Sequence, residues 1–492
     1  MSPKELYESL STTRKAYEDR AKEISKLTIP YLFVDDGASE STLIEDTYAS
    51  RYSAIAINAL ASNMSLTLLP PSGSSFRFDP DNKAMEDFTR GDANMRAGIM
   101  ALLGTQMARV NKEIENQEIR PQFFELLQCM IAVSPVVVEK VKGNGIKWHN
   151  IKTFAVKLDT RGEPLVLIVK ETLHKEDVPK GIEIDEDADT ADLYTMCELK
   201  DNKWTVTQSI DNEIVGSEST YAKDMLPYVY LGWTRQKGDT YHRPYAEQYL
   251  GILKDYSNIN KILIEGGLIA SKSLIMVNPL GTTRKKDVSD SKNGDVIDGR
   301  ADEVTAFQLG KNYDFQVPMQ LRQELTMQID KAFLSRQGTQ RDAERVTAEE
   351  IRANAQELEK NLSGIYSTMS KKFNKWLVKH IMKELSIKFD TIDVNVITGL
   401  DALGRNIEST KMDNFMMRMA NMQLTRWLKE EEIITRYASY EGIDIVNLVK
   451  TPDEIKQESA QAQDQMLQQQ LLSSGAESLG KGAAEAATTM PQ

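Results

Sequence analysis

The sequence predicts an α+β protein that is mainly helical, and two patterns carry that prediction. From Thr347 to Leu385, apolar residues recur at steps of three and four, the period of one helical face. From Val136 to Gln208, the pattern changes to alternating or β-branched runs, which is typical of strands. The 492 residues, 41% of them hydrophobic, can bury a substantial core and on length alone suggest about three domains.

The N-terminal part is expected to begin with helices. Their predicted ranges are 3–27, 47–68, 82–116 and 119–132. Strands are expected next, within 136–169, 193–199 and 204–208. The sequences Gly143-Asn144-Gly145 and Asp159-Thr-Arg-Gly162 are good turns between such strands. A compact sheet inserted between helices is therefore predicted.

Two more helices are expected on either side of an extended region. The first runs from Pro244 to Ser271, and the helical period is then lost from Leu274 to Phe307. The second begins near Pro318, which suits a first helical turn because proline lacks only an amide that would be unpaired there. Its apolar side consists of Leu321, Leu325, Ile329 and Phe333.

A single long helix is predicted over 347–385. Thr347 can accept a hydrogen bond from the amide of Glu350 while the Glu350 side chain reaches back, which makes a capping box. No proline interrupts the apolar period before Ser386. On periodicity alone, an ordinary core helix of a large helical protein fits equally well.

Beyond Ser386 the composition changes again. An extended piece is expected at 394–397, followed by helices whose methionines are typical of adaptable packing. These methionines are Met412, Met416, Met417, Met419 and Met422. From Ser459 onward, glutamine, alanine, glycine and serine predict a fraying helix and a disordered tail.

Two segments resemble ligand-binding motifs but fail the test for them. The stretch from Gly266 to Ser273 departs from a phosphate-binding loop at Ser271, and its expected order, helix before and extended chain after, is the reverse of what that loop needs. The acidic stretch 183–192 lacks the glycine and glutamate of a calcium loop, because Thr190 and Met196 stand at those positions. It is interpreted as a solvated loop.

Other chemistry is sparse. The four histidines, His149, His174, His242 and His380, show no pair at metal-ligand spacing, so no metal site is expected. Two cysteines, Cys129 and Cys197, make no disulfide framework. No catalytic constellation, signal peptide or membrane-spanning run is recognisable, since no apolar run approaches about 20 residues. We expect neither an enzyme, nor a cofactor, nor a membrane partner.

Collinear segments along most of the chain carry a family resemblance. They are Leu27-Thr-Ile-Pro30, Ala59-Leu-Ala-Ser-Asn63, Gly251-Ile-Leu-Lys-Asp255, Met276-Val-Asn-Pro279, Glu344-Arg-Val-Thr-Ala-Glu-Glu-Ile-Arg352 and Thr398-Gly-Leu-Asp-Ala-Leu-Gly-Arg405. Over roughly residues 5–425 the chain resembles the portal proteins, or head-to-tail connectors, of short-tailed, T7-like bacteriophages.

The resemblance implies a portal fold of wing, stem, clip and crown, assembled as a closed ring with an axial channel. The implied parts are a wing at 1–243 with a β insert at about 136–210, a first stem helix at 244–271, a clip at 272–313, a second stem helix at 314–334, a tunnel loop at 335–346, a long wing helix at 347–385, a crown at 386–458 and a flexible C-terminal tail at 459–492.

The tunnel loop implies a contact with DNA. Arg336, Arg341 and Arg345 would face the channel, and a closed ring would repeat each of them about twelve times around the axis. Alternatively, Arg341 and Arg345 pair with Asp342, Glu344 or Glu349 and merely order the loop.

A second basic cluster lies in the expected clip. Arg284, Lys285 and Lys286 would contact the packaging motor or entering DNA. The alternative is a solvated polar loop, because aspartates at 287, 290, 295, 298 and 302 bring the local charge near zero.

The implied function is a structural ring at one capsid vertex through which double-stranded DNA is packaged and ejected. Its expected partners are further copies of the chain in a dodecamer, the DNA, the large terminase subunit, the major capsid and scaffolding proteins, and tail adaptor and internal core proteins. We expect assembly in the host bacterial cytoplasm and residence in the virion. The alternative is a ring-forming structural adaptor that does not contact DNA.

The net charge of −13 fits such a channel, because an acidic wall repels phosphate and keeps contact with sliding DNA weak. The same charge also favours solubility, so it does not by itself distinguish the two functions.

Overall fold

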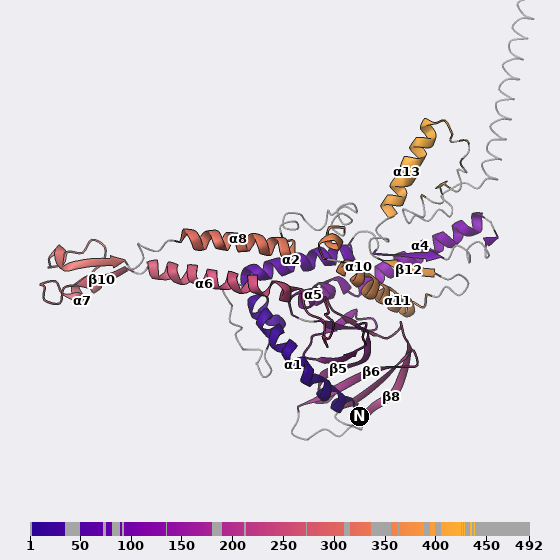
Figure 1. Ribbon diagram of the computed structural model, residues 1–492, viewed down its shortest axis with the longest axis horizontal. Helices are drawn as coiled ribbons and strands as arrows, with labels where there is room; N and C mark the ends of the chain where they lie inside the picture. The colour runs from indigo at the N-terminus through magenta and orange to yellow at the C-terminus, as the bar shows by residue number, and fades with distance from the viewer. Residues whose placement is uncertain are drawn as a thin grey trace, which may run out of the picture. The chain divides into compact units, whose positions relative to one another are not determined.

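The first helix, α1 (Pro3–Leu27), begins at a capping box in the computed structural model shown in Figure 1. The Ser2 hydroxyl accepts from the amide of Glu5 at 3.3 Å, and the Glu5 carboxylate accepts from the amide of Ser2 at 3.0 Å. The helix ends at Thr28, whose hydroxyl donates to the carbonyl of Ile24 at 2.7 Å. The predicted helix at 3–27 is confirmed.

The structure describes most but not all of the chain. The described residues are 2–34, 50–71, 75–80, 89–90, 93–133, 135–179, 189–210, 213–271, 273–308, 315–335, 356–362, 364–387, 394–398, 405–424, 426, 428, 433–434 and 437. They fall into two units, one formed by Met1–Asp81 with Met107–Asn406 and the other by Asn82–Gln106 with Ile407–Gln492.

The next helices are α2 (Ser50–Leu68), α4 (Ala93–Asn116) and α5 (Ile119–Ala132). α2 packs against α5 through side chains such as Leu60, Met64 and Phe123, which are fully buried. The helix predicted at 82–116 is interrupted at Arg90, which has a left-handed φ of 47°, and α4 covers its part from Ala93 onward, whereas 82–88 lie outside the described residues. The predicted range 119–132 is confirmed.

Two antiparallel sheets follow. The first has the order β3-β2-β9, from β2 (Val136–Lys140), β3 (Ile146–His149) and β9 (Tyr228–Leu231). The second has the order β4-β5-β6-β7-β8, from β4 (Phe154–Leu158), β5 (Pro164–His174), β6 (Thr190–Lys200), β7 (Lys203–Ile210) and β8 (Glu213–Ala222). The predicted insert is confirmed, but its predicted end near 210 is wrong.

Within this insert, the sequence analysis missed β8 and β9. β8 pairs only with β7, and its side chains are exposed or half-buried on both faces, so no apolar alternation marks it. The short β9 pairs back to β2 through contacts distant in sequence. The insert therefore extends to Leu231.

Both faces of the five-stranded sheet are covered. On one face, Tyr7 of α1 packs against Ala155, Ile168 and Tyr194. The opposite face carries Phe154, Val156, Leu167, Val169 and Cys197, which form a core with Tyr228, Tyr230 and Tyr241. Arg14 fixes α1 to the sheet edge by donating to the carbonyl of Phe154 at 2.7 Å.

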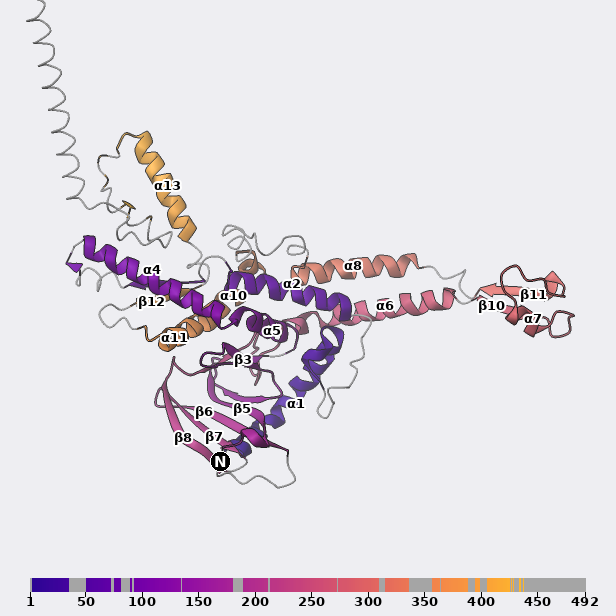
Figure 2. The ribbon, with the colours of Figure 1, turned by 180° about the vertical axis from the view of Figure 1, so that it is seen from behind.

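The helices predicted at 244–271 and 314–334 are present as η3 (Tyr245–Tyr249) with α6 (Leu250–Ser271), and as α8 (Gln316–Phe333). α6 and α8 are the predicted stem. α6 and α8 lie side by side in both views (Figures 1 and 2). After α6 the chain enters β10 (Ser273–Val277), which pairs antiparallel with β11 (Val304–Gln308). The short helix α7 (Lys285–Asp290) and the 3-10 turn η4 (Ala301–Glu303) lie between these strands.

The single helix predicted over 347–385 is wrong in its described part. The chain is helical over 356–361, turns at Gly364 with a left-handed φ of 84°, and continues as α10 (Ile365–Met369), the π-helix η6 (Ser370–Asn374) and α11 (Lys375–Glu384). The apolar period nevertheless predicted the buried face, since Leu358, Leu362, Phe373 and Ile381 are buried. The predicted capping box at Thr347 lies outside the described residues.

The extended piece predicted at 394–397 is β12 (Val394–Thr398). It pairs antiparallel with β1 (Phe76–Pro80), a strand that the sequence analysis did not predict. Both strands belong to the first unit, whose boundary falls at Asn406. The part predicted to begin at 386 therefore starts with residues that pack in the first unit.

The second unit contains most of α13 (Arg405–Asn421). The predicted methionines up to 419 lie on this helix, and Met417 is 63% exposed. Tyr437 donates to Asp413 at 2.7 Å. The predicted tail at 459–492 lies outside the described residues.

Candidate functional site

The base of the stem is a fixed aromatic cluster. Tyr245 donates to the carbonyl of Ala332 at 2.7 Å, and its ring contacts that of Phe333 with centroids 5.5 Å apart. Leu253 of α6 and Ile329 of α8 are buried alongside. These contacts hold the two helices together where they leave the core.

α8 ends in a tight turn. Leu334 adopts a left-handed φ of 53°, and the Ser335 hydroxyl donates to Asp330 at 2.5 Å. Asp330 also accepts from the hydroxyl of Tyr52 on α2, so the end of α8 is fixed to the N-terminal helices. Arg336, Arg341 and Arg345, predicted to contact DNA, follow this turn and lie outside the described residues.

Farther along the stem, large apolar side chains are exposed on both helices. Their exposed fractions lie between 38% and 64%. They are Ile262, Ile264, Leu268 and Ile269 on α6, and Val317, Met319, Leu321 and Met327 on α8. Periodicity had placed Leu321 with Leu325 on one apolar side, but only Leu325 is buried. Exposed apolar side chains that lie together are a feature of interaction surfaces.

Gly266 lies within α6 rather than in a phosphate loop. A Cβ at this position would lie 2.9 Å from the ring of Phe315, so glycine allows that ring to approach the helix. The segment from Gly266 to Ser273 contains the last turns of α6 and the first residue of β10, so the helix comes before the strand. The predicted order, opposite to that of a phosphate loop, is confirmed.

Within the predicted clip (272–313), the described residues 273–308 are arranged around Glu303. Its carboxylate accepts from the amides of Thr282 and Thr283 and from the hydroxyl of Thr283, each at 2.8 Å. These donors, led by the Thr283 hydroxyl, lower the pKa of Glu303 to about 2. A Cβ at Gly281 would lie 2.6 Å from the Glu303 carboxyl carbon, so a larger residue here would displace the carboxylate from its present position.

The predicted clip cations are exposed. Arg284 is the N-cap residue of α7, and Lys285 and Lys286 form its first turn. Within the described ranges, none of the three makes an ion pair, whereas Arg300 pairs with Asp302 at 3.2 Å. Their charges are therefore available to a partner.

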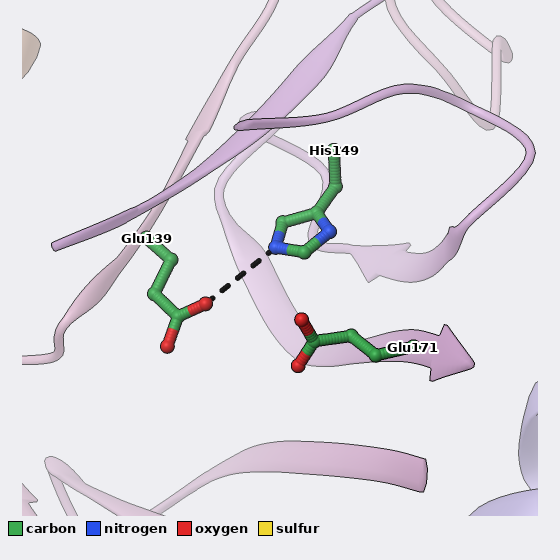
Figure 3. Close-up of side chains that lie close together, drawn as sticks. All are labelled: Glu139, His149 and Glu171. Atoms are coloured by element: carbon green, nitrogen blue, oxygen red, sulfur yellow. Dashed lines mark ion pairs between the residues drawn. The ribbon is translucent and has the colours of Figure 1, made fainter. Parts of the chain in front are cut away.

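A separate cluster of possible metal ligands lies between the two sheets. Glu139 of β2, His149 of β3 and Glu171 of β5 each place a potential ligand atom within 4.8 Å of the others (Figure 3). The sequence analysis examined only the spacing of histidines and cysteines, and a cluster formed by three strands leaves no such spacing. Cys129 and Cys197 are both buried.

The exposed apolar side chains of α6 and α8 and the exposed cations at the start of α7 form surface that another chain can contact. Comparison with known families gives the class. The model described as "Bacteriophage head to tail connecting protein" matches residues 2–422. The chain belongs to this family, as its resemblance to portal proteins predicts. No described helix has the length and apolar character needed to span a membrane.

Named relatives agree with this assignment. The chain is 28% identical to the portal protein of Escherichia phage T7, over 99% of this chain and 95% of the relative. It is 29% identical to the portal protein of Enterobacteria phage SP6, over 96% and 94%. A solved structure described as the neck of a native GTA particle computed with C12 symmetry covers 74% of this chain and 96% of its own, with 10% identity and a TM-score of 0.32.

Proposed function

We propose that the chain assembles into a closed ring of about twelve copies at one capsid vertex, with an axial channel for double-stranded DNA. The ring guides DNA during packaging and ejection, and it docks the large terminase subunit first and the tail afterwards. Capsid, scaffolding and internal core proteins are its other neighbours. Assembly takes place in the host cytoplasm.

The observation that carries the proposal is the exposed apolar surface of the stem. Leu268 on α6 is 60% exposed and Val317 on α8 is 64% exposed. In water, each such side chain forgoes a burial free energy of about 1.5 kcal/mol or more. A neighbouring copy covers this surface if α6 of one subunit packs on α8 of the next, and a head-to-tail contact of this kind closes into a ring when its rotation closes.

Charge supports a channel for DNA. The net charge of −13 is compatible with a channel wall that repels phosphate, and the arginines of the proposed tunnel loop follow α8 in the sequence. Weak repulsion with a few basic rings allows a duplex to slide without being held.

Electron microscopy of the purified chain tests the ring. Class averages should show closed rings of about twelve subunits with an axial hole. The substitution Leu268→Lys should reduce the ring fraction strongly, because it places a charge in the covered surface. The matched control Asn258→Lys changes an exposed polar residue of the same helix and should leave rings intact. Monomers of the unmodified chain, or rings unaffected by Leu268→Lys, would reject this assembly.

A further inference from the structure

His149 has a buried polar atom without a partner. Its side chain is 5% exposed, and Nε2 makes no hydrogen bond within the described part of the chain. The nearest carboxylate oxygen, Oε2 of Glu139, lies 3.6 Å away, which is too far for a hydrogen bond. Since buried polar groups are nearly always satisfied, this nitrogen indicates a ligand that completes the site.

Glu139 is oriented toward His149. The hydroxyl of Tyr228 on β9 donates to Oε1 of Glu139 at 3.0 Å, which leaves Oε2 to face the imidazole. Figure 3 shows the two groups pointing toward one another. Carboxylates that bind metals are usually held in place by a hydrogen bond to the oxygen that does not face the ion.

Glu171 supplies the third group from the other sheet. Its carboxylate lies beside the other two side chains in Figure 3, and Oε1 pairs with the ammonium of Lys147. The Lys147 ammonium would therefore compete with a metal ion for the Glu171 carboxylate. A surface cavity of about 730 Å³ is lined by His149, Lys147 and Glu171, which gives an ion a route from solvent.

From these contacts we propose that Glu139, His149 and Glu171 bind a divalent transition-metal ion, for which Zn²⁺ is the best fit. One imidazole and two carboxylates with a water suit Zn²⁺, whose bonds to nitrogen and oxygen are about 2.0–2.2 Å long. Tetrahedral ligands at that length are about 3.4 Å apart, close to the 3.6 Å between His149 and Glu139. The other distances between the potential ligand atoms are all within 4.8 Å, and rotation of the side chains can shorten them to the distance that a bound ion needs.

The ion's role is structural. Glu139 and His149 belong to the three-stranded sheet, and Glu171 belongs to the five-stranded sheet. A single ion joins the two sheets next to α1, whose Arg14 lines the same cavity. Binding to the folded state alone would raise thermal stability in proportion to the logarithm of the free metal concentration.

Titration of the untagged full-length protein with Zn²⁺ tests the site. Bound metal is counted by mass spectrometry, and affinity is measured by competition with a chromophoric chelator. We expect one ion per chain and a rise in the thermal midpoint. Both cysteines are buried, so thiolates do not compete at the surface. Mg²⁺ in place of Zn²⁺ should give no comparable rise, because the imidazole ligand favours transition metals.

Variants locate the binding. His149→Asn and Glu139→Gln should each weaken Zn²⁺ binding by about tenfold or more. Lys147→Met should strengthen it, because the competing ammonium is gone. His174→Asn is the matched control, since His174 is an exposed histidine on the same strand as Glu171.

Two outcomes would overturn the site: no stoichiometric Zn²⁺ bound to the unmodified chain, or the same affinity in His149→Asn as in His174→Asn. Circular dichroism of each variant separates loss of the site from loss of the fold. If His149→Asn fails to fold, the increase in affinity expected for Lys147→Met decides the proposal, and unchanged affinity in that variant rejects it.

Discussion

Glu359 caps the helix that begins after Gly364: its carboxylate accepts from the amide of Ser367 at 2.9 Å. The bond spans the turn at which the predicted long helix is broken. Gly364 adopts a φ of 84° there, a conformation that costs a residue with a Cβ about 1–2 kcal/mol. One glycine and one carboxylate thus divide the helical segment and begin its second part.

Replacing Gly364 tests this turn. Gly364→Ala should destabilise the protein by about 1–2 kcal/mol, because no atom crowds the new Cβ and only the backbone strain remains. Gly104→Ala, in the interior of α4 with nothing near its Cβ, should be neutral or stabilising by up to about 1 kcal/mol. Denaturant unfolding measures both. If Gly364→Ala left the free energy of unfolding unchanged, the helix would continue through residue 364 without a turn.

The loss of folding stability at acidic pH should depend on His242. Burial, followed by the nearby Lys372 and Arg235, lowers its pKa from 6.5 to about 4. The unfolded imidazole takes up a proton below about pH 6.5 and the folded one only near pH 4, so this contribution to stability is present above pH 6.5 and is lost as the pH falls toward 4. The expected loss is on the order of 3 kcal/mol.

The variant His242→Gln should flatten that pH dependence. Thermal midpoints measured between pH 7 and pH 4 should fall less steeply than in the unmodified chain. His174→Gln, at an exposed position, is the control and should keep the full slope. Equal slopes in all three proteins would contradict the assignment to His242.

Glu303 should hold the clip loop ordered down to low pH. Its hydrogen bonds favour the carboxylate and lower its pKa from the ordinary 4.5, so their contribution to stability is present above pH 4.5 and is lost as the pH falls through about 2. Glu303→Gln should increase hydrogen exchange at the amides of Thr282 and Thr283 several-fold at neutral pH, while Asp302→Asn should not. Unchanged protection factors in Glu303→Gln would show that the loop does not depend on the carboxylate.

The tunnel arginines should be needed for DNA but not for the ring. We predict that Arg336→Ala, Arg341→Ala and Arg345→Ala together lower the DNA content of heads while rings still form. The matched variant with lysine at all three positions keeps the positive charges. Heads that contain it should package DNA nearly normally, because a lysine ammonium can also contact a phosphate as a point charge. If the alanine variant packaged DNA normally but had lower thermal stability, the arginines would act by ordering the loop. That result would favour an adaptor that does not contact DNA.

The clip cations should set the affinity for the packaging motor. Lys285→Glu with Lys286→Glu should weaken binding of the large terminase subunit to purified rings and reduce its salt dependence, because unpaired exposed charges interact through a screened field. Lys200→Glu with Lys203→Glu, exposed at the turn between β6 and β7, is the control. Equal weakening by both pairs would indicate only a change in net charge.

Local patterns predicted much of the fold. The capped α1, the helix at 119–132 and the stem helices are marked by apolar period, proline and turn residues that act within a few positions. The family also followed from sequence, since its collinear segments span most of the matched range. The break at Gly364 had a local signal too, a glycine within a helical pattern, but an isolated glycine is tolerated in many helices.

The candidate site was only partly predictable. The clip cations could be read from composition, and the structure shows that they are exposed. The apolar side of the stem could not be assigned, because a helix buried by its own chain and a helix covered by another subunit share one periodicity. Leu325 is buried and Leu321 is 44% exposed, although they are neighbours on one face of α8.

The sequence by itself determined the helices, most strands, the family and the charge of this protein, because those properties depend on short-range pattern or on composition. Only the tertiary structure decided which distant residues meet. It paired β1 with β12, continued the insert to β9, and brought Glu139, His149 and Glu171 together from three strands. Such contacts depend on strand register and sheet packing, and no local spacing records them.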